Sequence, residues 1–469
     1  MKRRASGATA VLTVLVVAGC SNPSPSSPPS TSAGADATSS PVASGAASSS
    51  PTTSGAAQIP QPSVTGVDVA DLADRVDLAV PTFSNPTEIT NPLFPIALQS
   101  TELLVGTVED KAFRTEVTVL PWTQVIEWGG QQIETVVSQY NAFLDGRMEE
   151  IAYDLYAQAD DGSVWYLGES VFNFSNGAIV DTAGTWHAGI DGPGAMIMPA
   201  DPQVGDVYRT ENIPGLVFEE VVVQSTGETL DGPFGPVEGG IVVEEHHSDG
   251  STESKQFAPG YGEFYTAADG EVEALAMAIP SDTASGSQPD ALTSAAESAS
   301  GAVQAALDGE MSQVEQAAAD LESAVGDLGD AEIPALLRPL LTDGIAALST
   351  AASEGDEEAT TQAAIDVARL VNDLTLRYRS IPEVNLDRIG LWGAQLILDA
   401  GAENLEGIRS DNFAVDYARE RIVGGVPGEI VNELNTALEA LQLGIDDEDF
   451  GAIAEAAQGI RDLAGDIGS

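Results

Sequence analysis

The spacing of apolar residues divides the chain into a strand-like part and a helix-like part. In Glu149–Ala157 apolar residues alternate with polar ones, and after a short turn Ser163–Glu169 returns as a partner strand. Side chains of a strand alternate between two faces, so this pattern predicts a β-hairpin. The same reasoning predicts strands at Phe113–Leu120, Gln124–Trp128, Ile133–Phe143, Val171–Phe174, Ala178–Trp186, Asp206–Thr210, Leu216–Gln224, Gly240–His247, Glu253–Phe257, Gly262–Thr266 and Val272–Ile279. Because no helical pattern intervenes, we expect one large antiparallel sheet, built as a curled meander or half-barrel or as a sandwich.

Beyond Asp290 the apolar residues recur at a helical period. Val367, Val371 and Leu374 are spaced by three or four residues, which predicts an amphipathic helix. Short breaks rich in Asp, Glu, Asn and Ser recur between such segments, and these residues are good helix N-caps. We therefore predict an all-α domain of helical hairpins at Asp290–Leu328, Ile333–Arg379, Leu386–Gly424 and Pro427–Ile467. The predicted fold class is α+β, with the β domain first.

The N-terminus has the pattern of an export signal. Basic residues at Lys2–Arg4 precede the apolar run Ala10–Ala18, which is too short to span a bilayer. The sequence Val17–Cys20 resembles the lipobox of bacterial lipoproteins. That resemblance implies cleavage after Gly19 and a diacylglycerol group on Cys20, which would leave the protein anchored to a cell membrane and facing outside the cytoplasm. An ordinary secretory signal with an incidental cysteine is the alternative.

The remaining boundaries follow from shifts in composition. Residues 21–62 are almost wholly Ser, Pro, Ala, Thr and Gly, so they cannot bury a core and we expect a disordered tether. Val67–Val80 has a mild helical spacing, which predicts a helix docked on the domain that follows. We divide the chain into a signal peptide at 1–19, the lipidated cysteine and linker at 20–62, the antiparallel β domain at 63–280, a linker at 281–289 and an acidic α-helical domain at 290–469.

Charge limits the partners of this chain. It has 73 Asp and Glu against 18 Lys and Arg, a formal net charge of −55, so nucleic acid is excluded as a ligand. Once Cys20 carries lipid, no thiol remains for a disulfide or a metal. The carboxylates of the helical turns suggest weak divalent-cation binding, although no segment has the ligand spacing of a calcium loop. We otherwise expect no cofactor.

Four short stretches resemble a pattern found in secreted bacterial proteins and lipoproteins that have no assigned activity. They are Tyr153–Gln158, Val164–Glu169, Met198–Tyr208 and Phe257–Gly262. The resemblance covers residues 91 to 279 and implies an extracytoplasmic β domain. It supplies no catalytic residues.

Two groups of side chains are candidate sites in the predicted sheet. Aromatic residues concentrate in one part of it, where they either fill the core or line a ligand groove: Tyr153, Tyr156, Trp165, Tyr166 and Trp186. Glu245 and His247 share one face of a strand and are weak candidates for a metal site. A strand end of ordinary polar residues is the alternative for this pair.

The chain contains no serine-nucleophile, phosphate-loop or other catalytic motif that we recognise. We therefore expect a non-catalytic, membrane-anchored protein whose β domain binds an unknown protein or small molecule and whose helical domain serves assembly or spacing. A cation-binding envelope lipoprotein and an extracytoplasmic hydrolase with scattered residues are the alternatives.

Overall fold

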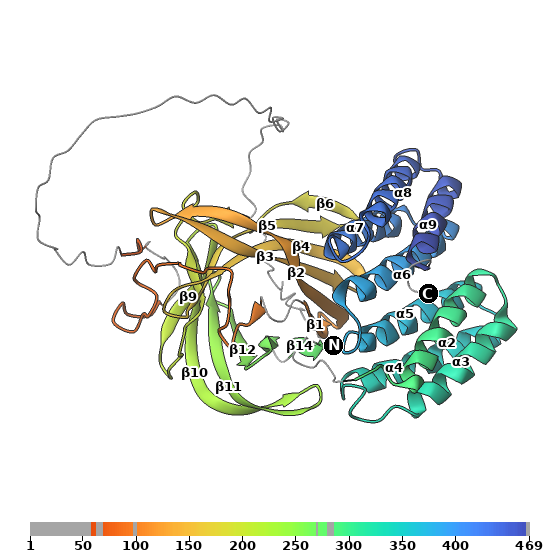
Figure 1. Ribbon diagram of the computed structural model, residues 1–469, viewed down its shortest axis with the longest axis horizontal. Helices are drawn as coiled ribbons and strands as arrows, with labels where there is room; N and C mark the ends of the chain where they lie inside the picture. Colours follow the sequence, from red (N-terminus) through yellow and green to blue (C-terminus); the bar gives the residue numbers. More distant parts are fainter. Residues whose placement is uncertain (1–57, 62–68, 97–100, 269–270, 279–285, 466–469) are drawn as a thin grey trace, which may run out of the picture.

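The computed structural model describes residues 58–61, 69–96, 101–268, 271–278 and 286–465. The lipobox with Cys20, most of the linker at 20–62 and part of the linker at 281–289 lie outside these residues. Within them the predicted fold class is confirmed, since a large antiparallel sheet precedes a domain built from helices (Figure 1).

One continuous antiparallel sheet forms the first domain. Its strands are β1 (Thr101–Val108), β2 (Lys111–Trp128), β3 (Gln131–Leu144), β4 (Arg147–Gln158), β5 (Val164–Ser175), β6 (Ala178–Asp181), β7 (Trp186–His187), β8 (Ala195–Met198), β9 (Val207–Ile213), β10 (Val217–Gly232), β11 (Gly235–His247), β12 (Thr252–Ala258), β13 (Gly262–Ala268) and β14 (Glu271–Ala278). The spatial order is β6-β5-β4-β3-β2-β1-β14-β13-β12-β11-β10-β9, and β7 and β8 each pair with β5. All these strands belong to one sheet, whereas a sandwich would have two sheets packed face to face. The structure therefore has the predicted curled meander and not the sandwich.

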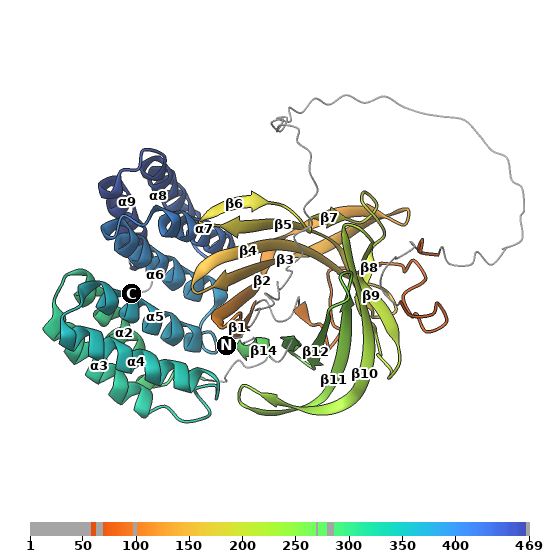
Figure 2. The ribbon, with the colours of Figure 1, turned by 180° about the vertical axis from the view of Figure 1, so that it is seen from behind.

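The curl of the sheet creates an enclosed inner face. Glu169 on β5 and Glu211 on β9 hydrogen-bond to each other, although these strands lie near opposite ends of the strand order. Register shifts in β2, β4 and β10 mark bulges, which bend a strand and increase its twist. Figures 1 and 2 show the resulting curvature from both sides.

Apolar residues on the inner face form the first core. It includes Val221 and Val243 from the sheet, and the segment 69–96 adds Ile89, Leu93 and Phe94. Phe94 meets Tyr156 edge-on, with ring centroids 5.0 Å apart. The N-terminal part of the β domain is therefore packed into the curl of the sheet.

The helix predicted over Val67–Val80 is wrong in the part that the structure describes, residues 69–80, which form a turn at 72–74 and isolated β-bridges instead. The amide of Val76 donates to the carbonyl of Val207 on β9 (2.9 Å), and the amide of Val207 donates to Asp74 (3.1 Å). Strand β9 lies at the edge of the sheet, so one side of it has backbone N–H and C=O groups that no neighbouring strand pairs. In addition, Arg75 is buried against Asp77, two residues on, a spacing that a helix would place on different faces.

Eight helices follow within residues 286–465. They are α2 (Asp290–Leu307), α3 (Met311–Gly326), α4 (Leu337–Glu354), α5 (Glu357–Thr375), α6 (Ile381–Gly401), α7 (Leu405–Ile422), α8 (Gly428–Asp446) and α9 (Phe450–Gly465). Consecutive pairs coincide with the four predicted hairpins. Contacts group them into two sets of four, α2–α5 and α6–α9, which meet where α2 and α5 contact α6.

The helical domain packs against the outer face of β2–β5. Phe143 and Ile151 from the sheet share a core with Trp392 and Ile408 from the helices. The rings of Phe143 and Trp392 stack, with centroids 5.6 Å apart. Figure 2 shows α7 lying beside β4 and β6. Among the described helices, none combines the length and the apolar character that crossing a membrane requires.

Candidate functional site

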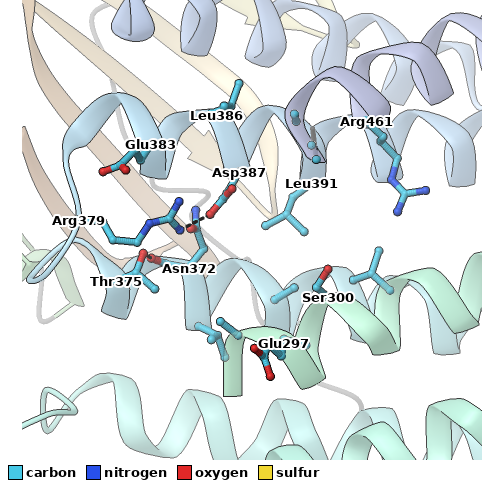
Figure 3. A pocket seen from close by; sticks show the side chains of 18 of the residues that line it. Glu297, Ser300, Asn372, Thr375, Arg379, Glu383, Leu386, Asp387, Leu391 and Arg461 are labelled. Atoms are coloured by element: carbon cyan, nitrogen blue, oxygen red, sulfur yellow. Dashed lines mark hydrogen bonds and ion pairs between the residues drawn. The ribbon is translucent and has the colours of Figure 1, made fainter. Parts of the chain in front are cut away.

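A cleft of about 1270 Å³ opens between the two sets of helices, and we call it the helical cleft. Residues of α2, α5, α6 and α9 line it, together with the turn Gly425–Pro427. Its walls combine apolar side chains such as Val303, Val371 and Leu391 with a few polar groups that converge on the same space (Figure 3). Ligand sites commonly have this mixture of walls, at volumes of about 300–1,000 Å³.

Local sequence signals fix the walls of the helical cleft. Helix α6 begins with a capping box, in which the side chains of Ser380 and Glu383 satisfy each other's backbone amides. Pro382 stands in its first turn, where the missing amide costs nothing. The turn at Gly425 approaches so closely that a Cβ there would lie 2.1 Å from Pro382, so this position requires glycine.

Two arginines lie at opposite ends of the helical cleft in Figure 3. Arg379 pairs with Asp387, and this charge is neutralised. Arg461 instead donates to the side-chain oxygens of Gln304 (3.1 Å) and Gln458 (3.5 Å), with no carboxylate within 4.0 Å among the described residues. Burial lowers the pKa of Arg461, although a guanidinium remains charged in any normal solution.

The inner face of the sheet carries a second polar cluster, which we call the inner acidic strip. It consists of Glu150, Asp154, Glu169, Glu211, Glu219, Glu245, Glu253, Glu263 and Glu273, with His247 and Lys255. Lys255 meets Glu245 at 2.8 Å, and the two nitrogens of His247 lie 3.4 Å from Glu219 and 3.6 Å from Glu253. Two cations therefore face nine carboxyl groups.

Burial raises the pKa values of several carboxyl groups in the inner acidic strip, whereas those of Glu219 and Glu253 are lowered because hydrogen bonds and the nearby His247 and Lys255 outweigh burial. Burial raises the pKa of Glu150 to about 7, with help from Asp154, and that of Glu273 to about 7, with help from Glu253. The pKa values of Glu169 and Glu211 also rise, first through burial and then because each lies near other carboxylates. Carboxyl groups that are buried close together cannot all be ionised, because desolvation and the neighbouring negative charges both disfavour the carboxylate. Some of them therefore keep their protons. The strip is thus partly protonated at neutral pH.

The two metal-ligand candidates are part of this strip. Glu245 and His247 share its face, as the strand spacing predicts, but each is engaged in an ion pair. Burial would lower the pKa of His247, yet its hydrogen bonds to Glu219 and Glu253 prevail and raise it to about 10. A protonated imidazole has no lone pair to give a metal. Among the described residues, no group of three His, Cys, Asp or Glu side chains is arranged to hold a metal ion.

The structure places the aromatic candidates in the cores. Trp165 and Trp186 are 1% and 0% exposed, and Tyr156 and Tyr166 stack beside them with centroids 4.8 Å apart. Tyr153 points the other way, into the contact with α7, where its hydroxyl donates to Glu420 (2.8 Å). Core packing, the alternative to a ligand groove, therefore describes this group.

A third polar cluster lies between the two domains, and we call it the interface network. It comprises Arg114, Glu116 and Gln139 from the sheet and Asp373, Arg388 and Arg421 from the helices. Arg114 bridges Glu116 (2.8 Å) and Asp373 (2.7 Å). Burial alone would raise the pKa of Glu116, but the surrounding arginines outweigh it and hold that pKa well below its usual range.

Sequence reasoning missed Arg461. It did single out four arginines of the helical domain as partners of nearby carboxylates, namely Arg338, Arg369, Arg377 and Arg379. Arg338, Arg369 and Arg379 each pair with a carboxylate in the structure. Arg377 donates to the carbonyl of Ala331 and lies over the ring of Phe234. The sequence did indicate that Arg461 has no ion-pair partner on its own helix, because the positions three and four residues away hold only Ala, Gln and Gly. Arginines of the same domain such as Arg419 have an Asp three residues away.

No protein-family model and no curated protein sequence matches this chain. What the site does is therefore inferred from its own residues.

Proposed function

We propose that this protein is a lipid-anchored, extracytoplasmic binding protein without a catalytic role, and that a small molecule occupies the helical cleft. The lipobox-like Val17–Cys20 supports the anchor. The helical cleft itself is the single observation that carries the binding role, because it combines a large volume with apolar walls and convergent polar groups.

The proposal moves the ligand from the β domain, where the sequence led us to expect it, to the helical domain. The inner face of the sheet is occupied by its own apolar core, by the segment 69–96 and by the inner acidic strip. The sheet then acts as the rigid base on which the helical domain is docked through the interface network.

Two measurements test the two halves of the proposal. Labelled palmitate should appear on the wild-type chain, and a Cys20→Ser variant should carry no label and leave the membrane fraction. A Cys20→Ser variant that stays in the membrane fraction would contradict the anchor.

Extraction of ligands from the purified full-length protein tests the binding half. Ser300 is exposed on α2 and lines the helical cleft, so Ser300→Trp should narrow the cleft and obstruct a ligand without disturbing a core. We expect organic extracts of wild type to contain a small molecule that mass spectrometry does not find with Ser300→Trp. Identical extracts from both, with both proteins equally folded, would overturn the binding role.

A further inference from the structure

Arg461 forms no ion pair within 4.0 Å with a carboxylate of the described residues, although Asp462 and Asp308 lie near enough to attract its charge. Most of the other described arginines contact a carboxylate: Arg75, Arg114, Arg147, Arg209, Arg338, Arg369, Arg379, Arg388, Arg419 and Arg421. Arg461 is half-buried, and it donates hydrogen bonds to the neutral amides of Gln304 and Gln458. A half-buried guanidinium that is held only by neutral amides can still accept an anion of a ligand.

The side chains around Arg461 orient it toward the helical cleft. Gln304 comes from α2 and Gln458 from α9, so the guanidinium is held between two helices that line the cleft. Figure 3 shows Leu391 lying between Arg461 and the Arg379–Asp387 pair. A guanidinium presents parallel N–H groups that match the oxygens of a carboxylate or a phosphate ester.

Other features of the lining restrict the charge and shape of a ligand. Carboxylates at Glu297, Glu383 and Asp462 also line the helical cleft, so a second negative charge on a ligand would be repelled. Between its ends the walls are apolar, with Val303, Val371 and Leu391 contributing. An apolar body alongside these residues would be removed from water at a gain of about 25 cal/mol per Å².

We propose that the helical cleft binds an amphiphile that carries one negative charge, with its head group on Arg461 and its apolar body along Val303, Val371 and Leu391. This inference rests on the proposed function, because it names the class of ligand for the same cleft. A carboxylate and a phosphate diester share the required single charge, whereas a phosphate monoester carries up to two.

Calorimetric titration of the full-length protein tests the inference, with dodecanoate as the probe and dodecanol as its uncharged counterpart. We expect dodecanoate to bind wild type, Arg461→Gln to weaken that binding about tenfold, the value of one charge-assisted hydrogen bond, and dodecanol binding to be unaffected by Arg461→Gln. Arg419→Gln is the matched control, because Arg419 lies outside the helical cleft and pairs with Asp416. Lysophosphatidylglycerol, a singly charged diester, and dodecyl phosphate distinguish the head groups, and the monoester should bind more weakly at pH 8.

The outcomes separate this inference from the proposed function. Binding that Ser300→Trp abolishes but Arg461→Gln leaves unchanged would overturn the charge selection and keep the cleft as the site. Binding that Ser300→Trp does not change would overturn both. Absence of dodecanoate and diester binding to a folded wild type would overturn the inference, while the extraction experiment still decides the function.

Discussion

The inner acidic strip and the interface network bury the same kind of side chain in opposite charge states. In the interface network, Glu116 is surrounded by Arg114, Arg388 and Arg421 and remains a carboxylate. In the inner acidic strip, nine carboxyl groups share Lys255 and His247, and several of them keep their protons to neutral pH. The charge state of a buried acid is therefore decided by where the few cations of this chain lie.

The contrast also separates two kinds of stability. Ion pairs of the interface network join the domains at every ordinary pH, because arginine does not lose its charge. The contribution of the inner acidic strip to the free energy of unfolding depends on pH, because its carboxyl groups outnumber its cations.

The largest effect should come from breaking the interface network. Arg421 is buried, and replacing it with methionine removes its contacts with Glu116 and Gln139. We expect Arg421→Met to lower the free energy of unfolding by about 3–5 kcal/mol, since a buried charge loses a partner. Urea unfolding at pH 7 measures this. Arg419→Met, at a partly exposed pair with Asp416, is the control and should cost less than about 1 kcal/mol. Equal losses would show that the network does not hold the domains together.

A smaller effect is expected from removing the amine of the inner acidic strip. Lys255→Met leaves Glu245 without the nitrogen that lies 2.8 Å away. We expect a loss of about 2–3 kcal/mol at pH 7 and a smaller loss at pH 5, where the carboxyl groups take up protons instead. Lys111→Met, at an exposed strand start, is the control. A loss at pH 5 as large as that at pH 7 would contradict the shared-proton description.

The smallest effect is the pH dependence of the wild-type protein. The folded-state pKa of Glu150 and of Glu273 is about 7, above the ordinary 4.5, so between these values the folded chain binds more protons than the unfolded chain. Stability therefore falls as the pH rises from 4.5 to 7. The raised pKa of His247, about 10, acts in the same direction, because its contribution is complete below 6.5 and is lost between 6.5 and 10.

We accordingly expect wild type to unfold at a lower urea concentration at pH 8.5 than at pH 5.5, by a free energy on the order of 1 kcal/mol for each of these partly exposed groups. A Glu150→Gln/Glu273→Gln double variant should show a flatter dependence between pH 5 and 7. Glu116 shifts in the opposite sense, so its contribution is lost only as the pH falls below about 4.5. A protein that becomes more stable from pH 5.5 to 8.5 would contradict the assignment.

Most of the fold could be predicted from local patterns in the sequence. The strands and the four helical hairpins were predictable because alternation and helical spacing act over a few residues. The failure over Val67–Val80 has a non-local cause, since the backbone around Arg75 pairs with β9, far along the chain. The fourteen strands show the same limit, because alternation predicts each strand but not the curl.

The sites were less predictable than the fold for the same reason. Glu245 and His247 were recognised as sharing a face, but their partners come from two other strands, Glu219 from β10 and Glu253 and Lys255 from β12. The helical cleft depends on how α2 and α5 meet α6 and α9, which no short segment encodes. The absence of an acid three or four residues from Arg461 was readable in the sequence, but its place in a cleft was not.

The pairing of β1 with β14 has a consequence for the order of folding. Nearly all other neighbours in the sheet are hairpins that can form soon after their residues are synthesised, whereas this seam joins Leu103 to Ala278 across the whole domain. Closing so long a loop is slow, so the seam should form late.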